Sequence, residues 1–558
     1  MAPSVIYIPM PRMQIDLPDP PEAWPAEFLR LLKSNEPPTQ AQVTEIQPML
    51  AHARENMTIL FRASEKLQGI IDACKAIISP IRQLPPEILL EIFLWINVDR
   101  APVDVFSMAS IPCTLGLVCR QWRGIVRSTA GFWSNILVRG FSNDRHGPVP
   151  INRLRLLEQA LALSNGQLLS IRCSLDSDGL LEIERERDAI QEKWPIPTEC
   201  DEDTIVMALN REVLRLLVRE SPRWNNVCFR IDDYAYLPIL NGARGKLDQL
   251  TTLSFGMIPG WIESRSVIVF NAFEVAPKLR NVELSRMGDV VPVLPMQQLV
   301  SVREEWYDHN SLNEHLKRLC EMPNLQGYDL DGFDYELNSR APIQHNALRV
   351  LHACTPGAFT SLELPNLEEV CLKAASFDNA CRFTTLHKLP GLIDRSRCSI
   401  RKLILSDVME SEDLVPVLER TPNLNELHVE QNRWHFDGNQ FIARVAKYLR
   451  IREDGQIPLP NLHTLTISVR GSPKWDVPFD LPMTFLKRKT AEMIRNRWNI
   501  AGGSAVDRLR FVRIYISVPS KYHIAPYDEF AEGLRGLQED GLNISVSIIG
   551  GDETLYQL

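Results

Sequence analysis

The chain has 558 residues, 45% of them hydrophobic and 23% charged, which excludes a disordered protein, a collagen and a simple coiled-coil rod. At about 150 residues per domain, this length favours about four domains unless a repeat fold is present. The net charge of −9 and the pI near 5.8 argue against nucleic-acid binding, which needs a basic domain or stripe. A basic cluster at residues 487–489, Arg495 and Arg497 is interpreted as a solvated helix face, with a nuclear-import or phosphate patch as the alternative.

The eleven cysteines are scattered, odd in number and never at C-x-x-C spacing. Neither a disulfide framework nor a zinc site is therefore expected, and reduced thiols in a cytoplasmic or nuclear protein are favoured. The first residues lack the basic region and apolar core of a signal peptide, and no apolar run approaches the length of a membrane span. We expect no membrane partner, no nucleic-acid partner, no metal and no cofactor.

Residues 1–39 are rich in proline and predict an irregular lead with one short helix over residues 27–33. From residue 40 to residue 79, apolar residues recur at steps of three and four. This periodicity predicts one long amphipathic helix, or two with a break near Pro48, ending before Pro80. Packing against the rest of the chain is favoured for its apolar face, and a coiled-coil dimerisation helix is the alternative.

Two short apolar segments follow. The first, residues 84–96, begins with Leu84-Pro85-Pro86-Glu87, and its proline and glutamate suit the first turn of a helix. The second, residues 115–126, predicts another amphipathic helix and is followed by Phe132-Trp133. Helices this short cannot cover all these large apolar side chains by themselves, so a partner surface is expected.

Together the two segments resemble the F-box. The family pattern is, loosely, L-P-x-E-[IL]-L-x-x-I-F, then L-x-x-V-C-[RK]-x-W-R, then L/F-W, and residues 80–138 fill nearly every position in order. The stretch between the two parts, residues 97–112, is longer than is usual in the family and predicts a loop. The long preceding helix makes the chain similar to the large F-box family of fungi in particular.

The resemblance implies docking onto a Skp adaptor, itself bound to a cullin and a RING subunit in a ubiquitin ligase. It implies a non-catalytic chain that holds a protein substrate near the ubiquitin-conjugating enzyme. We expect Trp122 to be shared between the adaptor and the F-box core, and one group to face the adaptor: Leu84, Pro85, Ile88 and Leu89. The expected adaptor-binding residues are Leu84, Pro85, Glu87, Ile88, Leu89, Ile92, Phe93, Val118, Cys119 and Trp122.

After Trp133 the chain repeats the phrase Leu-x-x-Leu-x-Leu, often led by Pro-Asn or Pro-Lys. This is the strand phrase of leucine-rich repeats. A long gap between two phrases predicts a weak repeat near residues 296–302. The clear phrases begin at Leu250, Leu279, Leu325, Leu348, Leu367, Ile400, Leu424, Leu462 and Leu509. The chain is thus expected to have an α/β fold, with an N-terminal helix and a three-helix F-box. An irregular solenoid with a curved parallel sheet follows over residues 150–558. A helix over residues 529–539 and a strand over residues 543–549 would cap it.

The x residues within each strand would line the concave face of such a sheet, the best place for substrate capture. Any one of them alone is interpreted as plain solvated surface. They carry both signs of charge, so a phosphorylated substrate is not specifically implied. The candidates are Glu283, His352, Glu369, Lys373, Lys402, Glu426, His428, Thr464, Thr466, Arg513 and Tyr515.

The sequence holds no phosphate-binding loop, dinucleotide fingerprint, zinc-protease motif or nucleophile elbow. His435, beside Trp434, is interpreted as structural or solvated. The leading hypothesis is therefore a substrate-recognition subunit of a Skp–cullin–F-box ligase, acting in the cytoplasm, the nucleus or both. The alternative is a binding scaffold that delivers no substrate for ubiquitination.

Overall fold

The computed structural model divides the chain into two compact units, Met1–Ile96 and Asn97–Leu558. The boundary falls within residues 80–138, the range expected for the F-box. The structure describes residues 24–34, 36–96, 101–140, 150–175, 202–257, 267–306, 312–332, 342–373, 386–408, 412–432, 436–452, 455–470, 488–500, 507–518, 530, 534, 536–550 and 553–557. His435, residues 1–23 of the proline-rich lead and most of the expected cap helix lie outside these ranges.

The first unit is helical: α1 (Ala26–Lys33), α2 (Gln40–Ile78), a 3₁₀ turn (Pro80–Gln83) and α3 (Pro86–Ile96). The short helix and the long helix are both confirmed, and α2 runs through Pro48 as one helix. A capping box starts it, because the Thr39 side chain accepts from the Gln42 N–H while the Gln42 side chain accepts from the Thr39 N–H. The helix ends at Ile78, two residues before Pro80, whose ring cannot continue it.

The apolar face of α2 does not pack into a core. Asn56 is the helix's buried residue, whereas its large apolar side chains stay exposed. The expectation that this face packs on the rest of the chain stays a prediction. The exposed group is Leu50, Met57, Ile59, Leu60, Phe61, Leu67, Ile70, Ile71, Ile77 and Ile78.

Near the start of the second unit, the sequence predicted one helix over residues 115–126, and the structure has two. Residues 111–128 form α4 (Ile111–Val118) and α5 (Arg120–Ser128), separated by Cys119 in an extended conformation. The Cys119 thiol accepts a hydrogen bond from the Trp122 N–H at 3.5 Å and so caps α5. Part of the expected loop is also ordered, because β1 (Val103–Asp104) pairs with β2 (Asn135–Arg139) and α4 begins at Ile111. A 3₁₀ turn (Ala130–Trp133) leads into β2.

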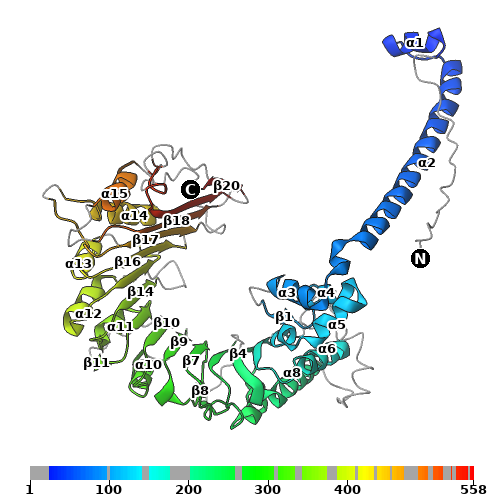
Figure 1. Cartoon of the computed structure of the whole chain (residues 1–558). Coiled ribbons are helices and arrows are strands. Elements are labelled where there is room, and N and C mark those ends of the chain that lie inside the picture. Colours follow the sequence, from blue (N-terminus) through cyan, green and yellow to red (C-terminus); the bar gives the residue numbers. More distant parts are fainter. Residues whose placement is uncertain are drawn as a thin grey trace. The chain divides into compact units, whose positions relative to one another are not determined.

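One sixteen-stranded sheet forms the frame of the second unit, and helices lie along the outside of its arc (Figure 1). Neighbouring strands are parallel except for the closing pair β19–β20. After β1 and β2 come β3 (Leu169–Ser174), β4 (Trp224–Ile231), β5 (Thr252–Met257), β7 (Asn281–Ser285), β9 (Ser301–Trp306), β10 (Gly327–Gly332), β12 (Val350–Ala353), β14 (Glu369–Lys373), β15 (Lys402–Ser406), β16 (Glu426–Gln431), β17 (Thr464–Arg470), β18 (Phe511–Val518), β19 (Asn543–Gly550) and β20 (Glu553–Gln557).

The repeat phrase predicted these strands well. All nine phrases lie on strands of the sheet, and the weak repeat near residues 296–302 leads into β9. The expected closing strand is β19. The start of the sheet differs from expectation: β1 and β2 precede residue 150, because Ile136 and Val138 alternate into the same core as the repeats.

The leucine positions of successive repeats stack in register. Val302 on β9 pairs with Tyr328 on β10, which pairs with Leu351 on β12, and all three are buried. The recurring Pro-Asn has a role as well, because its asparagine reaches back to the preceding repeat. Asn324 Nδ2 donates to the Gln297 carbonyl at 2.7 Å, and Asn366 Nδ2 to the Asn346 carbonyl at 2.8 Å. Each repeat thus completes its neighbour, as a solenoid requires.

The outer helices are α6 (Pro150–Leu163), α8 (Glu202–Arg219), α9 (Leu237–Leu240), α10 (Leu312–Leu319), α11 (Pro356–Ser361), α12 (Leu389–Ser396), α13 (Leu414–Glu419), α14 (Phe436–Tyr448) and α15 (Arg488–Trp498). Two small parallel pairs, β6 (Ile268–Phe270) with β8 (Val290–Pro292) and β11 (Ile343–Gln344) with β13 (Leu362–Glu363), supplement them. The basic cluster is not simply a solvated face, because Arg497 on α15 is buried. None of the described helices combines the length and apolar content needed to cross a membrane.

Candidate functional site

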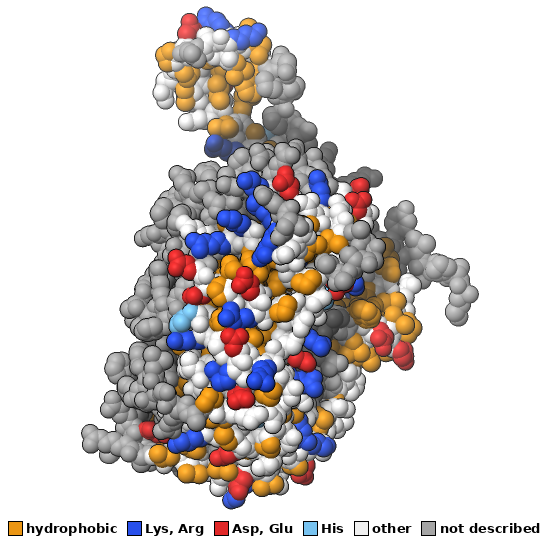
Figure 2. All heavy atoms as spheres, turned by 90° about the vertical axis from the view of Figure 1, so that its left-hand side faces the viewer, with side chains coloured by type: hydrophobic (Ala, Val, Ile, Leu, Met, Phe, Trp, Pro, Cys, Tyr) orange, Lys and Arg blue, Asp and Glu red, His pale blue; other side chains and the backbone are white. Residues whose placement is uncertain are grey.

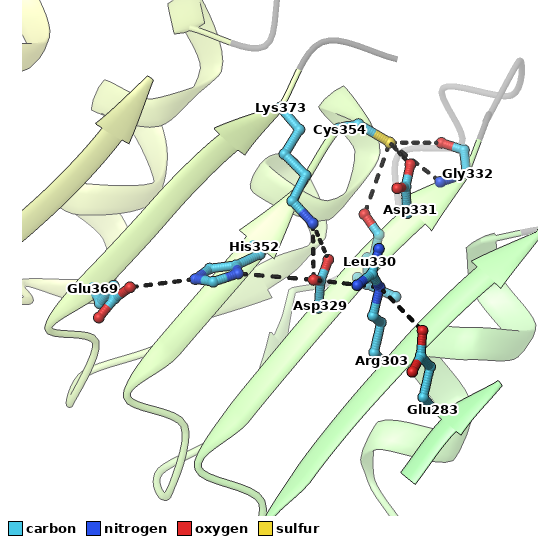
Figure 3. Close-up of polar contacts among 10 residues, drawn as sticks. All are labelled: Glu283, Arg303, Asp329, Leu330, Asp331, Gly332, His352, Cys354, Glu369 and Lys373. Atoms are coloured by element: carbon cyan, nitrogen blue, oxygen red, sulfur yellow. Dashed lines mark hydrogen bonds and ion pairs between the residues drawn. The ribbon is translucent and has the colours of Figure 1, made fainter. Parts of the chain in front are cut away.

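The inner face of the sheet carries charged side chains on neighbouring strands, centred on Asp329 of β10 (Figure 3). Lys373 Nζ, from β14, donates to both carboxylate oxygens of Asp329 at 2.8 Å. Arg303 Nε approaches the same carboxylate at 3.7 Å from β9. These contacts arise because parallel strands in register place residues of one face side by side.

The same pattern continues on both sides of Asp329. Toward the start of the sheet, Arg303 Nε lies 3.9 Å from Glu283 on β7. On the other side, His352 lies 3.8 Å from Asp329 through Nδ1 and 3.4 Å from Glu369 through Nε2. Lys402 Nζ reaches Glu369 at 3.1 Å. We call these seven residues the charge ladder: Glu283, Arg303, Asp329, His352, Lys373, Glu369 and Lys402.

The surroundings shift the pKa values of Asp329 and Asp331 in opposite directions. Burial raises the pKa of Asp329, but the His352 ring and the Lys373 ammonium outweigh it and leave that pKa below its ordinary value. Burial dominates at Asp331 and raises its pKa, even though Lys373 opposes the effect. Burial also raises the pKa of the Cys354 thiol to about 12, so this thiol stays protonated near neutral pH.

The structure brings some predicted candidates together and leaves others apart. Five of them join the charge ladder: Glu283, His352, Glu369, Lys373 and Lys402. Glu426 and His428 form a separate pair at 3.5 Å on β16. Burial, aided by the Lys402 ammonium, lowers the pKa of His428. The remaining candidates lie on β17 and β18: Thr464, Thr466, Arg513 and Tyr515. Their role in substrate binding stays a prediction.

Two members of the charge ladder were missed from the sequence, Arg303 and Asp329. Asp329 occupies the x position between the second and third apolar residues of a repeat phrase, and Arg303 occupies the same position in the degenerate phrase of β9, where Glu304 replaces the third apolar residue. The same rule that selected Glu283 and His352 would have found them. On the face drawn in Figure 2, acidic and basic side chains are interspersed as well. The described residues include no group of acids, histidines and cysteines arranged to hold a metal ion.

Asp329 makes the charge ladder sensitive to acid. Because its pKa is lowered on folding from an ordinary 3.8, its stabilising contribution is present above that value and is lost as the pH falls through the lower folded-state pKa. We expect the urea midpoints of the wild type and Asp329→Asn to differ at about pH 6 and to converge toward about pH 3. A difference that stays constant with pH would contradict this electrostatic origin.

The segments of the F-box pattern are divided between the two units, and each unit presents its own apolar side chains. On α3, Ile88 is 48% exposed and Pro85 is exposed, while Leu84 and Ile92 are half-buried. On the second unit, Val118 is 59% exposed, Cys119 is exposed and Trp122 is half-buried. Both surfaces therefore carry apolar side chains accessible to a partner.

Two residues of this pattern belong to the core. Leu89 is 1% exposed and Phe93 is fully buried, so the expectation that Leu89 faces a partner is corrected. Leu89 directly follows the exposed Ile88 in the sequence. The helical rotation of about 100° per residue turns the Leu89 side chain toward the core. Sequence reasoning also missed exposed apolar residues beside the pattern, namely Leu94, Trp95 and Leu117.

Comparison with protein families supports the interpretation of these segments. A family model described as F-box-like matches residues 81–139. These residues form an F-box-like domain. It spans α3, α4, α5 and β2, so the F-box-like domain includes the first strands of the sheet. Domains of this family are typically non-catalytic and act in protein interaction. The described fold after it is the α/β repeat array expected from the sequence.

A search of solved structures lists "Crystal structure of TLR13-ssRNA13 complex", with 14% identity and a TM-score of 0.28. The match covers 54% of this chain and 40% of that one, so the chain spans less than half of the structure that it matches. A likeness this remote carries no argument about function. No curated protein matches the chain. The F-box-like domain is therefore the part of the molecule from which function can be argued.

Proposed function

We propose that the protein is the substrate-recognition subunit of a Skp–cullin–F-box ubiquitin ligase, acting in the cytoplasm, the nucleus or both. The exposed apolar residues of the F-box-like domain carry the proposal, since water-exposed Ile88 and Val118 have no structural benefit without a partner. They would dock the Skp adaptor, which connects to the cullin and RING subunits. The chain itself would hold the substrate and carry out no reaction.

The charge ladder is the proposed substrate surface. It offers paired cations and anions on a rigid sheet, which suits a protein substrate with complementary charges of both signs. The rival proposal is a binding scaffold that captures proteins through the same face without recruiting a cullin. Recruitment of a cullin is what distinguishes the two proposals.

The test of adaptor docking is co-purification of the full chain with a Skp adaptor, a cullin and its RING subunit. We expect the wild type to retain all three and the double variant Ile88→Asp/Val118→Asp to lose them. A hot-spot residue contributes about 2 kcal/mol, roughly a thirtyfold loss for each substitution. Both side chains are exposed, so the variant should keep the wild-type circular dichroism melt.

A matched control is Val415→Asp on α13, where the same change falls on a side chain that is 40% exposed outside the F-box-like domain. It should bind the adaptor like the wild type. A wild type that binds the adaptor but recruits no cullin would favour the scaffold. A wild type that binds no adaptor, or a double variant that binds it unchanged, would reject the proposed docking surface.

Substrate capture is tested separately. We expect Lys373→Glu/Lys402→Glu to lose proteins that the wild type captures in cells while keeping the adaptor, because two cations of the charge ladder change sign. Lys317→Glu, an exposed lysine on α10, is the control for charge alone. Equal capture profiles for all three proteins would exclude the charge ladder as the substrate surface.

A further inference from the structure

One repeat of the array carries a carboxylate where its neighbours carry an apolar side chain. In the register of the sheet, Glu304 on β9 pairs with Leu284 on β7 and with Leu330 on β10, and both leucines are buried. Glu304 itself is 4% exposed. A buried carboxylate is costly unless it is paired and hydrogen-bonded, so this position requires an explanation.

A compact polar network surrounds Glu304. Tyr328 donates its hydroxyl to Glu304 Oε2 at 3.0 Å, and Arg318 Nη2 lies 3.1 Å from Oε1. His315 Nδ1 lies 2.6 Å from Oε2. Burial raises the pKa of Glu304, but the His315 hydrogen bond and the Arg318 guanidinium outweigh it and keep the carboxylate ionised. An ionised carboxylate only accepts hydrogen bonds, so Nδ1 of His315 carries a proton, and the tautomer with this single ring proton has its lone pair at Nε2.

Arg318 also lies close to this histidine, with Nη2 at 2.6 Å from Nδ1. A guanidinium only donates, so Arg318 can bond to Nδ1 only if Nδ1 carries no proton. The negative charge of Glu304 favours the other arrangement, in which Nδ1 carries the proton and donates it to the carboxylate. The network therefore fixes the tautomer of His315, and its other nitrogen is left as an acceptor.

A cavity of about 120 Å³ adjoins this network, between the end of β9, the start of α10 and the β6–β8 pair. Trp306 and His315 line it and stack with ring centroids 4.2 Å apart. Trp306 is 3% exposed and His315 is 6% exposed. The buried Trp306 Nε1, His315 Nε2 and Arg318 Nε have no hydrogen-bond partner among the described residues. Val267 and Val291 give the cavity an exposed apolar rim.

The chemistry of the lining restricts the ligand. Four carboxylates line the cavity with one guanidinium, that of Arg318: Asp289, Glu304, Glu305 and Glu314. Arg286 lies 3.5 Å from Glu305, and the remaining excess of negative charge disfavours a carboxylate or phosphate ligand. An ammonium or guanidinium would suit that charge but has no acceptor for the N–H groups of Trp306 and Arg318. A primary amide satisfies both requirements. Its carbonyl accepts from N–H donors, and its NH₂ donates to His315 Nε2.

We propose that this cavity is a second binding site, away from the charge ladder, that takes the primary amide of an asparagine or glutamine side chain from a protein ligand. The apolar rim would cover the methylene groups of that side chain, and the stacked Trp306 and His315 would hold its amide. The site belongs to the second unit alone and does not depend on adaptor docking.

The test uses propionamide as the probe and the Trp306 indole N–H as the reporter, in the full chain labelled with ¹⁵N-tryptophan. Trp306→Phe assigns its signal among the eleven tryptophans. We expect propionamide to shift this signal in a saturable manner. Propionate and n-propylammonium at the same concentrations should leave it in place. His315→Phe keeps an aromatic ring but loses Nε2, and should weaken propionamide binding about tenfold, the effect of one lost hydrogen bond.

A second variant pair guards against a folding defect in His315→Phe. Val267→Phe narrows the rim without touching the Glu304 network, and should abolish the propionamide response. Val269→Phe changes a similarly exposed valine on β6, two residues after Val267, that does not line the cavity, and should respond like the wild type. The proposal is overturned if propionamide produces no shift, if all three probes act alike, or if Val267→Phe keeps the full response.

Discussion

The Arg497→Ala variant should lose about 3–5 kcal/mol of unfolding free energy, because several buried hydrogen bonds from a charged donor to backbone carbonyls are lost. Arg497 lies on α15 with its guanidinium buried. Its Nε donates to the Leu449 carbonyl at 2.8 Å, and Nη1 and Nη2 donate to the Leu459 and Pro458 carbonyls. These carbonyls belong to the end of the α14 turn and to the segment before β17, which have no helix or strand partners of their own.

The burial of Arg497 is strong enough to lower its pKa to about 10, and the group remains charged at neutral pH. Removing it would take the guanidinium donors from the Leu449 and Pro458 carbonyls, leave the Leu459 carbonyl with the Leu462 N–H alone, and open a cavity between α14 and α15. The midpoint of urea unfolding measures the loss. Hydrogen exchange in residues 445–470 should accelerate with it, because those residues depend on the lost contacts.

Two companion variants make this prediction specific. Lys489→Ala removes an exposed cation from the same helix and should stay within about 0.5 kcal/mol of the wild type. Arg497→Lys keeps the charge but cannot present three separated N–H donors, and should fall between the other two. An Arg497→Ala midpoint equal to that of Lys489→Ala would show that the carbonyl contacts contribute nothing.

The sheet was predictable from the sequence because one physical rule repeats along it. A strand that buries alternate residues against neighbouring repeats needs an apolar residue at fixed spacing, so phrases such as Leu424-x-x-Leu427-x-Val429 identify strands directly. The rule even located β9 from a degenerate phrase. It could not predict Cys119 as a helix cap, because the spacing of Val118, Trp122 and Val126 fits an unbroken helix equally well.

The sites were less predictable, because they depend on contacts between distant residues. The x positions placed Glu369 and Lys402 on one face, but their pairing requires the register of β14 with β15. The F-box pattern likewise identified the segment containing Ile88 and Leu89 without saying which of them is buried. Arg497 looked like part of a solvated cluster, since the carbonyls that bind it lie about forty residues earlier in the chain.

Glu304→Ala should be the other strongly destabilising change, again by about 3–5 kcal/mol. The substitution removes the acceptor of His315 and Tyr328 and the counter-charge of Arg318, and all of these polar groups lie at least partly in the interior. Loss of the carboxylate therefore leaves the Arg318 guanidinium without compensation and His315 Nδ1 without its acceptor, and it leaves the Tyr328 hydroxyl only the longer bond to the His315 carbonyl at 3.3 Å. The urea midpoint at neutral pH measures the effect.

Glu304→Leu separates two explanations of that loss. If the repeat only needed an apolar residue at this position, leucine would restore the pattern of Leu284 and Leu330 and stabilise the protein. We expect it to destabilise instead, because leucine fills space but accepts no hydrogen bond from Tyr328 or His315. Leu403→Ala on β15, a buried leucine of an ordinary repeat, should cost about 2–5 kcal/mol and provides the scale for a pure packing defect. A Glu304→Leu variant as stable as the wild type would mean that the polar network contributes no net stability, and that its retention must serve the adjoining cavity.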